Sequence, residues 1–282
     1  MPRVPLSAAA LPWPDLVFHV LAHVPARFPS SAYDPGYVHF AARHLGPAAR
    51  RELGRDARHL TQAATDHDTL ARVQLLAVLF DDMERAARSA STPLEKLGPN
   101  DVDRAELLAP LREAATLCEL LRCAVELERV DHARLPPVRV ATAALQAALD
   151  AALPASPSLE GYRVRTVRAL GHRGRLFGGM IWVGAPDGGT VGPTPEHAAW
   201  QAAHESTVGE VHHAGRRTQT PLSEREVEHV AVVLLSERSR RAGLGQAHRR
   251  WYARMDDDGP PNADGLPGQA KPLLEGLLAS GP

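Results

Sequence analysis

The dipeptide His204-Glu205 places an imidazole next to a carboxylate, two groups that bind metal ions and transfer protons in many hydrolytic sites. Position 208, four residues after the histidine and on the same helical face, is a valine. A hydrocarbon side chain cannot coordinate a metal, so this turn offers one metal-binding imidazole instead of two. On an ordinary amphipathic helix the same dipeptide would be a polar pair without a chemical role, and the sequence leaves that interpretation open.

Capping signals place this pair on one helix and a further glutamate on the next. Thr194-Pro195 predicts a helix start, because threonine caps a helix N-terminus and proline fits its first turn. Ser223 and Glu226 form a capping-box pattern that starts the following helix, which carries Glu228. The chemistry of the pair therefore depends on how two consecutive helices pack.

A β-hairpin is predicted before these helices. Residues 162–168 alternate between apolar and polar for most of their length, and residues 175–183 form an apolar second strand. Gly171 and Gly174 bound the turn between them. The predicted order is therefore a hairpin, a helix and a second helix.

A strand leading into a helix with His-Glu, followed by a helix with a glutamate, resembles the catalytic half of the gluzincin metallopeptidases over residues 160–240. The helical region before it resembles the helical first half of some bacterial members. In that family the helix reads His-Glu-x-x-His, and both histidines and a later glutamate bind zinc. The resemblance implies that His204 matches the first ligand and Glu205 the general base. It implies Glu228 as the third ligand, and it puts Val208 where the second histidine belongs.

The same resemblance implies a peptide-binding groove. In this class of fold an extended peptide lies antiparallel to the strand before the metal helix, and its main chain pairs with unpaired N–H and C=O groups. This mode of binding needs no zinc. The candidate peptide-binding residues on the strand are Arg175, Phe177, Met180 and Trp182. The alternative is that these side chains pack in the core.

Other histidines are candidate ligands. Asp15, His19 and His23 follow one another at intervals of four on a predicted apolar helix. Two histidines at this interval can bind one metal, while an aspartate can orient a ring. His19 or His23 could then join His204 across the fold. A polar stripe facing solvent, or a buried and hydrogen-bonded histidine, is the alternative.

His212 is a further candidate partner for His204. It lies eight residues later, which is about 12 Å along a helix axis. Zinc–nitrogen bonds are about 2 Å long, so both rings can bind one ion only if the helix breaks. Gly209 is the position where it could break.

The predicted fold is α+β, mostly helical with one small antiparallel sheet. Residues 1–153 are predicted to form a helical N-terminal region, and residues 154–282 the hairpin plus a helical, metallopeptidase-like region. The proline-containing segment 154–160 is a soft boundary, and we expect one compact unit. The tail after Asp256 predicts loop and one short helix over residues 273–278.

Composition argues against several classes of protein. The net charge of -1 disfavours a dedicated nucleic-acid binder. No apolar run approaches the roughly 20 residues of a membrane span, and the N-terminus is too short and proline-broken for a signal peptide. The two cysteines predict core thiols in a reducing compartment. We therefore expect a cytoplasmic protein without a nucleic-acid or membrane partner.

Three functions fit these observations. The first is a non-catalytic pseudoenzyme that holds an extended peptide or protein segment along its edge strand, without a cofactor, as an accessory to a peptide-modifying pathway. The second is an active metal-dependent hydrolase with zinc, using His204 and Glu228 with His19 or His23, and Glu205 as the base. The third is a helical interaction or regulatory domain. The sequence does not predict an oligomeric state.

Overall fold

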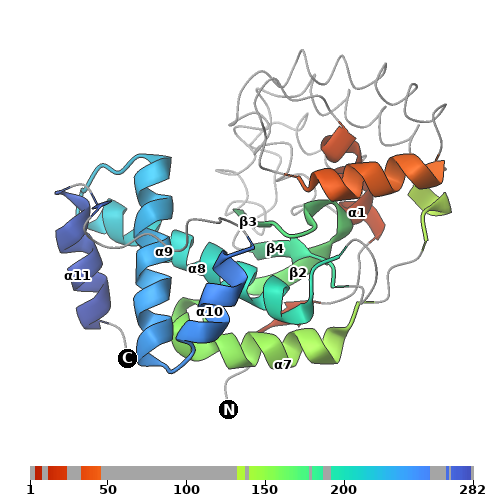
Figure 1. Cartoon of the computed structure of the whole chain (residues 1–282). Coiled ribbons are helices and arrows are strands. Elements are labelled where there is room, and N and C mark those ends of the chain that lie inside the picture. The colour runs from red at the N-terminus through yellow and green to blue at the C-terminus, as the bar shows by residue number, and fades with distance from the viewer. Residues whose placement is uncertain are drawn as a thin grey trace, which may run out of the picture. The chain divides into compact units, whose positions relative to one another are not determined.

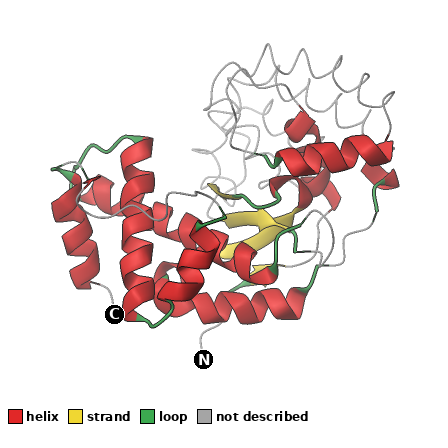
Figure 2. Cartoon of the chain, viewed as in Figure 1, coloured by secondary structure: helices red, strands yellow, loops and turns green. Residues whose placement is uncertain are grey.

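The computed structural model describes residues 4–7, 12–23, 33–45, 132–136, 140–177, 180–186, 192–254, 265–266 and 268–280. Helices dominate them and one small sheet accompanies the helices, which confirms the predicted mostly helical α+β class (Figure 2). The chain divides into two compact units. The first contains residues 1–8, 139–166 and 172–282, and the second contains residues 9–138 and 167–171. Within the described ranges, no helix combines the length and the hydropathy needed to cross a membrane.

The first unit contains a four-stranded mixed sheet in the order β1-β2-β4-β3. Its strands are β1 (Leu6–Ser7), β2 (Arg163–Val167), β3 (Gly174–Phe177) and β4 (Met180–Gly184). β1 pairs in parallel with β2, whereas β3 pairs antiparallel with β4. Among the strands that the structure describes, β3 therefore lies at an edge with one backbone side unpaired.

The sheet differs from the predicted hairpin in two respects. Residues 175–183, predicted as one strand, belong to the two strands β3 and β4, which pair with each other. Gly178 and Gly179 separate them in the sequence, and glycine weakens the interior of a strand. The sheet is also mixed rather than antiparallel, because β1 adds to β2 and Val164 N–H donates to the Pro5 carbonyl at 2.9 Å.

Two caps predict helix starts in the first unit, which contains five α-helices in its described ranges. They are α7 (Thr142–Ala152), α8 (Pro195–Arg217), α9 (Glu224–Arg241), α10 (Gly245–Tyr252) and α11 (Ala270–Ser280). The Thr194 hydroxyl accepts a hydrogen bond from His197 N–H at 3.2 Å and caps α8. The predicted capping box of Ser223 and Glu226 is present at the start of α9. The helix predicted over 273–278 is longer and forms α11.

α10 has no counterpart in the sequence-based prediction. Leu244 occupies its N-cap position and makes no side-chain hydrogen bond there, so the usual start signal is absent. The helix instead buries His248 and Trp251, which lie three residues apart on one face. Short helices gain most of their stability from such tertiary packing rather than from intrinsic propensity.

α8 is the central helix of the first unit (Figure 1). It contacts α7, α9, β3 and β4, and every residue from 197 to 207 is buried. This stretch includes polar side chains, which need partners when they lose water. The Ser156 hydroxyl is a hydrogen-bond partner for two of them, because it lies 2.7 Å from Ser206 Oγ and 3.1 Å from Thr207 Oγ1. His204-Glu205 thus lies in a segment of α8 that is buried all round, not on an amphipathic surface helix.

The second unit contains α1 (Pro12–His23) and a helix over residues 35–45. The Asp34 carboxylate accepts a hydrogen bond from Gly36 N–H at 2.7 Å at the predicted cap. Asp34 N–H donates to the Ala169 carbonyl at 3.2 Å, which ties this cap to the short 3-10 helix η5 (Arg168–Leu170). The helices predicted between positions 46 and 131 lie outside the described residues.

Candidate functional site

The site joins the predicted dipeptide on α8 to the predicted glutamate on α9. His204 Nε2 lies 2.9 Å from Glu228 Oε2, although the two residues are 24 positions apart in the sequence. The His204 side chain is 10% exposed and the Glu228 side chain 55% exposed. The pair therefore lies where the contact between the two helices meets solvent.

Glu205 faces another neighbour of α8, the edge strand β3. Its Oε1 accepts a hydrogen bond from Gln201 Nε2 at 3.2 Å, and 8% of the residue is exposed. A Cβ built on Gly174 would lie 2.7 Å from Gln201 Cγ and 2.8 Å from Glu205 Cγ. β3 therefore begins in direct contact with these two buried side chains, at a distance that only glycine allows.

The charges around the pair shift three pKa values. Burial lowers the pKa of His204, but the hydrogen bond to Glu228 and the nearby carboxylate charges outweigh it and raise that pKa above its ordinary value. Burial raises the pKa of Glu205, and the charges of His204 and Arg175 offset this only in part. Burial also acts to raise the pKa of Glu228, but the bond to His204 and the Arg175 charge hold it below its ordinary value. An imidazolium–carboxylate pair thus lies beside a carboxyl group that resists ionisation.

Val208 lies four residues after His204, the spacing at which the metallopeptidase motif has its second histidine. It is half-buried and packs against the apolar cluster formed by α8, α9 and α11. Within the part of the chain that the structure describes, no three His, Cys, Asp or Glu side chains are arranged to hold a metal ion. The turn therefore contributes to the core where the family motif would contribute a ligand.

α8 is also unbroken at Gly209. A Cβ at this glycine would lie 2.5 Å from Leu176 Cδ2 and 2.6 Å from the Tyr162 hydroxyl, so the glycine allows the sheet to approach the helix. His212 is exposed and stays about 12 Å along the axis from His204. The helix break that would bring these two histidines together does not occur.

His19 belongs to the second unit. It is fully buried, and its Nδ1 lies 2.8 Å from the Tyr37 hydroxyl. Burial raises the pKa of Tyr37, so the hydroxyl keeps its proton. The side chain of His23 lies outside the described residues. His19 thus has the surroundings of a buried, hydrogen-bonded histidine.

Asp15, one turn before His19, is the centre of an ion pair in the same unit. Its carboxylate accepts hydrogen bonds from Arg168 N–H at 2.7 Å and from Arg168 Nε at 2.6 Å, and His132 Nε2 lies 3.1 Å away. Burial acts to raise the pKa of Asp15, but the His132 hydrogen bond and the Arg168 charge lower it to about 2. These contacts tie α1 to η5.

The predicted peptide-binding residues lie on β3 and β4. Arg175 and Met180 are half-buried. Trp182 is 1% exposed, and the Arg165 guanidinium lies over its ring at 5.5 Å from the centroid. The side chain of Phe177 lies outside the described residues. Arg175 is therefore the described member of this set that lies on the edge strand.

A cluster of rings beside His204 was not predicted. Trp251 lies 5.7 Å from His204 and 5.5 Å from His248 between ring centroids, and Trp200 lies 5.5 Å from His248. Burial and the His204 charge lower the pKa of His248 to about 4. The sequence shows His248 and Trp251 three residues apart, which would place them on one face of a helix. This spacing indicates a site only when it is known that α10 packs on α8.

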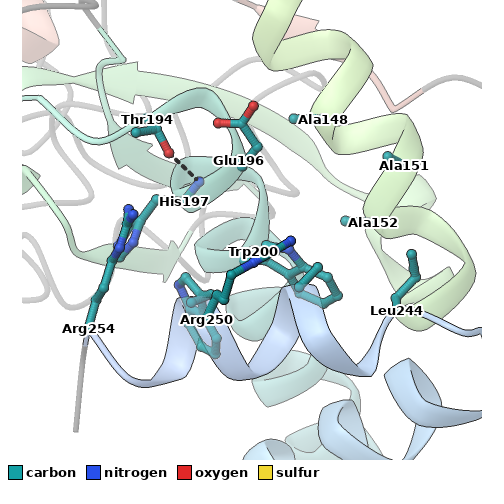
Figure 3. A pocket seen from close by; sticks show the side chains of 12 residues that line it. Ala148, Ala151, Ala152, Thr194, Glu196, His197, Trp200, Leu244, Arg250 and Arg254 are labelled. Atoms are coloured by element: carbon teal, nitrogen blue, oxygen red, sulfur yellow. Dashed lines mark hydrogen bonds between the residues drawn. The ribbon is translucent and has the colours of Figure 1, made fainter. Parts of the chain in front are cut away.

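A cavity of about 340 Å³ adjoins this cluster, between α7, the first turns of α8 and α10 (Figure 3). Ala148, Ala151 and Ala152 line it from α7, and Trp200 and Trp251 line it from α8 and α10. The small alanine side chains leave the space open. The sequence predicts the helices α7 and α8, which form two walls of the cavity. It does not predict α10, which forms the third wall.

Comparisons of the chain with protein-family models, with curated proteins and with solved structures found no match.

Proposed function

We propose that this protein holds an extended peptide along β3 in the cytoplasm without cutting it, on a gluzincin-like scaffold with an incomplete metal site. The supporting observation is the edge position of β3, which is unpaired on one side among the described strands and rests on the α8 face that carries Gln201 and Glu205. A guest strand added to such an edge gains main-chain hydrogen bonds, and side-chain pockets add selectivity.

The register of the β3–β4 pair identifies the free backbone groups. Phe177 opposes Met180 across two intervening residues, and the residues that flank a two-residue hairpin loop form a hydrogen-bonded pair. On that pattern hydrogen bonding to β4 alternates along β3, and the Arg175–Trp182 pair would be the next bonded one. The N–H and C=O groups of Gly174 and Leu176 point to the unpaired side. A guest chain would pair with these two residues.

The surroundings of His204 support binding without metal chemistry. Metal-binding histidines almost always donate the second ring nitrogen to an acceptor, which fixes the ring. His204 Nδ1 is buried and has no hydrogen-bond partner within the described ranges. Its Nε2 is already engaged by Glu228, and Val208 offers nothing to a cation.

Main-chain pairing can be tested with backbone-methylated peptides. The probe is a pool of fluorescein-labelled, N-acetylated hexapeptides with mixed side chains at alternate positions. Two further pools carry N-methyl groups on either the odd or the even residues. Because a strand presents alternate N–H groups to its neighbour, one methylated pool should lose at least about tenfold in affinity while the other binds like the parent.

Equal affinity of both methylated pools for the wild-type protein would end the proposal, as would cleavage of the parent peptides. Gly161→Ala serves as a folding control, because a Cβ at this glycine meets nothing within 4 Å. Its binding should match the wild type. Gly174→Ala should lose binding, because the added Cβ displaces the start of the edge strand from α8.

The convergence of His204 and Glu228 favours a metal-dependent hydrolase as a second candidate function. The 2.9 Å distance between His204 Nε2 and Glu228 Oε2 supports it, because the resemblance implies both groups as ligands, and Glu205 would be the base. Zinc would be the metal. Stoichiometric zinc in the purified protein, lost in His204→Ala together with peptide cleavage, would replace the first proposal by this one.

A further inference from the structure

The cavity between α7, α8 and α10 has the size and walls of a small-molecule site. Its volume of about 340 Å³ falls at the lower end of the roughly 300–1,000 Å³ that ligand pockets span. Two indole side chains and four alanines supply the apolar and aromatic wall. Trp200 is 6% exposed and Trp251 is 4% exposed, so both rings are fixed by packing rather than free in solvent.

Two arginines carry the charge at one side of this cavity. Arg250 and Arg254 both line it, four residues apart, and both are exposed. Neither guanidinium forms an ion pair or hydrogen bond with another residue in the described ranges. Glu196 is the one carboxylate among the described lining residues, and in Figure 3 it lies above both arginines in the view. The single carboxylate therefore leaves an excess of positive charge around an apolar space.

We propose that this cavity binds a small amphipathic acid. An aromatic or branched apolar group would occupy the space between Trp200, Trp251 and the alanines of α7. Its carboxylate would be held by Arg250 and Arg254, whose planar guanidinium groups match a carboxylate in geometry and charge. The acid is either a free molecule or the C-terminal residue of a peptide with an aromatic side chain. The proposal goes beyond peptide binding at β3 and uses different residues.

Calorimetric titration of the full chain with 2-naphthylacetate tests the proposal. Its neutral isostere 2-naphthylacetamide has the same ring system and no charge. We expect saturable one-to-one binding of the acid and at least tenfold weaker binding of the amide. The double variant Arg250→Ala with Arg254→Ala should bind both probes with the same, weak affinity. Arg249→Ala is the matched control, because Arg249 is exposed on the same helix and does not line the cavity. It should behave like the wild type.

A variant that fills the cavity tests the location. Ala151 lines the cavity from an exposed position on α7, so Ala151→Phe adds volume there without displacing core side chains. It should abolish binding of both probes. Undiminished binding by folded Ala151→Phe, or equal affinity of the wild type for acid and amide, would overturn the proposal. Ala151→Phe should leave hexapeptide binding at β3 unchanged, which separates this site from the one at β3.

Two peptide probes distinguish the sources of the acid. N-acetyl-glycyl-phenylalanine carries a free C-terminal carboxylate, and its amide does not. Binding of this acid at least tenfold tighter than 2-naphthylacetate supports a peptide C-terminus as the occupant. The reverse order supports a free acid.

Discussion

His204 and Glu228 form a hydrogen-bonded pair across the contact between α8 and α9, with 2.9 Å between Nε2 and Oε2. The pKa of the imidazole is raised and that of the carboxyl group is lowered, so each group favours the ionised form of the other. The packing of these two helices therefore includes a contribution that depends on pH.

Glu228→Gln should lower the free energy of unfolding by about 1 kcal/mol, because it removes the charge of a partly exposed pair. Because the pKa of His204 is raised, its protonated ring contributes fully to the stability of the folded state below pH 6.5, the ordinary pKa of histidine. This contribution to stability is lost as pH rises through the raised pKa. The lowered pKa of Glu228 makes its contribution complete above 4.5, and this is lost as pH falls through the lowered pKa. Urea denaturation at about pH 5.5 should therefore show a larger difference than at about pH 9.

Glu275→Gln removes a carboxylate from an exposed position on α11 and is the control for this measurement. It should change stability by less than about 0.5 kcal/mol at both pH values. A Glu228→Gln effect that is the same at both pH values would show that the pair does not act electrostatically.

Val208→His tests whether the turn has the geometry of a zinc site. Two ligands on one tetrahedral zinc lie about 3.3 Å apart, so the 2.9 Å pair of His204 and Glu228 needs only a small opening. The new imidazole on the same face would complete three ligands. We expect about 1–3 kcal/mol of destabilisation without metal, because Val208 packs in an apolar cluster, and recovery of stability with stoichiometric zinc.

Val208→Gln has a similar size and polarity but is a poor zinc ligand, so zinc should not raise its melting temperature. Folded Val208→His protein that fails to bind zinc would contradict the assignment of this turn to a metallopeptidase-like geometry.

His248→Gln should make the protein less sensitive to acid. The pKa of His248 is lowered from 6.5 to about 4 by burial and by the His204 charge. As pH falls below 6.5, His248 binds a proton in the unfolded chain but not in the folded chain. The folded state therefore loses stability between pH 6.5 and about pH 4. Between about pH 7.5 and about pH 4.5, the free energy of unfolding of the wild type should fall by about 2–3 kcal/mol more than that of the variant.

The exposed His213 on α8 provides the comparison for His248. His213→Gln should leave the pH dependence of unfolding unchanged, as measured by urea denaturation at the same two pH values. If His248→Gln follows the wild-type pH profile, His248 accepts its proton in the folded protein and the burial argument is wrong.

Gly174→Ala should destabilise the first unit by about 1–3 kcal/mol, because the added Cβ meets Gln201 Cγ at 2.7 Å and Glu205 Cγ at 2.8 Å. Hydrogen exchange should show faster exchange in β3 and in the part of α8 around these side chains. Gly161→Ala should not change exchange there. Unchanged protection in β3 of the Gly174 variant would show that the strand does not depend on this close approach.

Asp15→Asn should destabilise the second unit by about 3 kcal/mol at neutral pH, because it leaves the Arg168 guanidinium without its buried partner. The pKa of Asp15 is lowered to about 2, so its contribution is present above 3.8 and is lost as pH falls toward 2. Hydrogen exchange of α1 at about pH 7 measures the effect. Arg43→Gln, at an exposed position in the same unit, should leave α1 unchanged.

Local interactions made several elements predictable. The caps at Asp34, Thr194 and Ser223 depend on side chains that bond to backbone groups two or three residues away, so a short sequence contains the whole signal. The start of α8 and the start of α9 were therefore predicted correctly. The proximity of His204 and Glu228 could be expected only from the family resemblance, because no local rule relates residues on different helices.

The unpredicted features depend on long-range packing. α10 lacks a cap and exists because His248 and Trp251 are buried, so its cavity could not be predicted either. β1 has two residues and pairs with a strand more than 150 positions away, a contact without a local signature. Residues 175–183 were predicted as one strand because β3 and β4 are both apolar, and the glycines between them were not taken as a turn.

The pairing of Leu6–Ser7 with β2 has a consequence for synthesis on the ribosome. The first residues of the chain must wait until the segment around Val164 has been translated and has left the exit tunnel before their strand can form. Folding of the first unit therefore cannot finish from the N-terminus onward. A fragment that begins after Ala8 would lack the pairing that Leu6 and Ser7 make with β2.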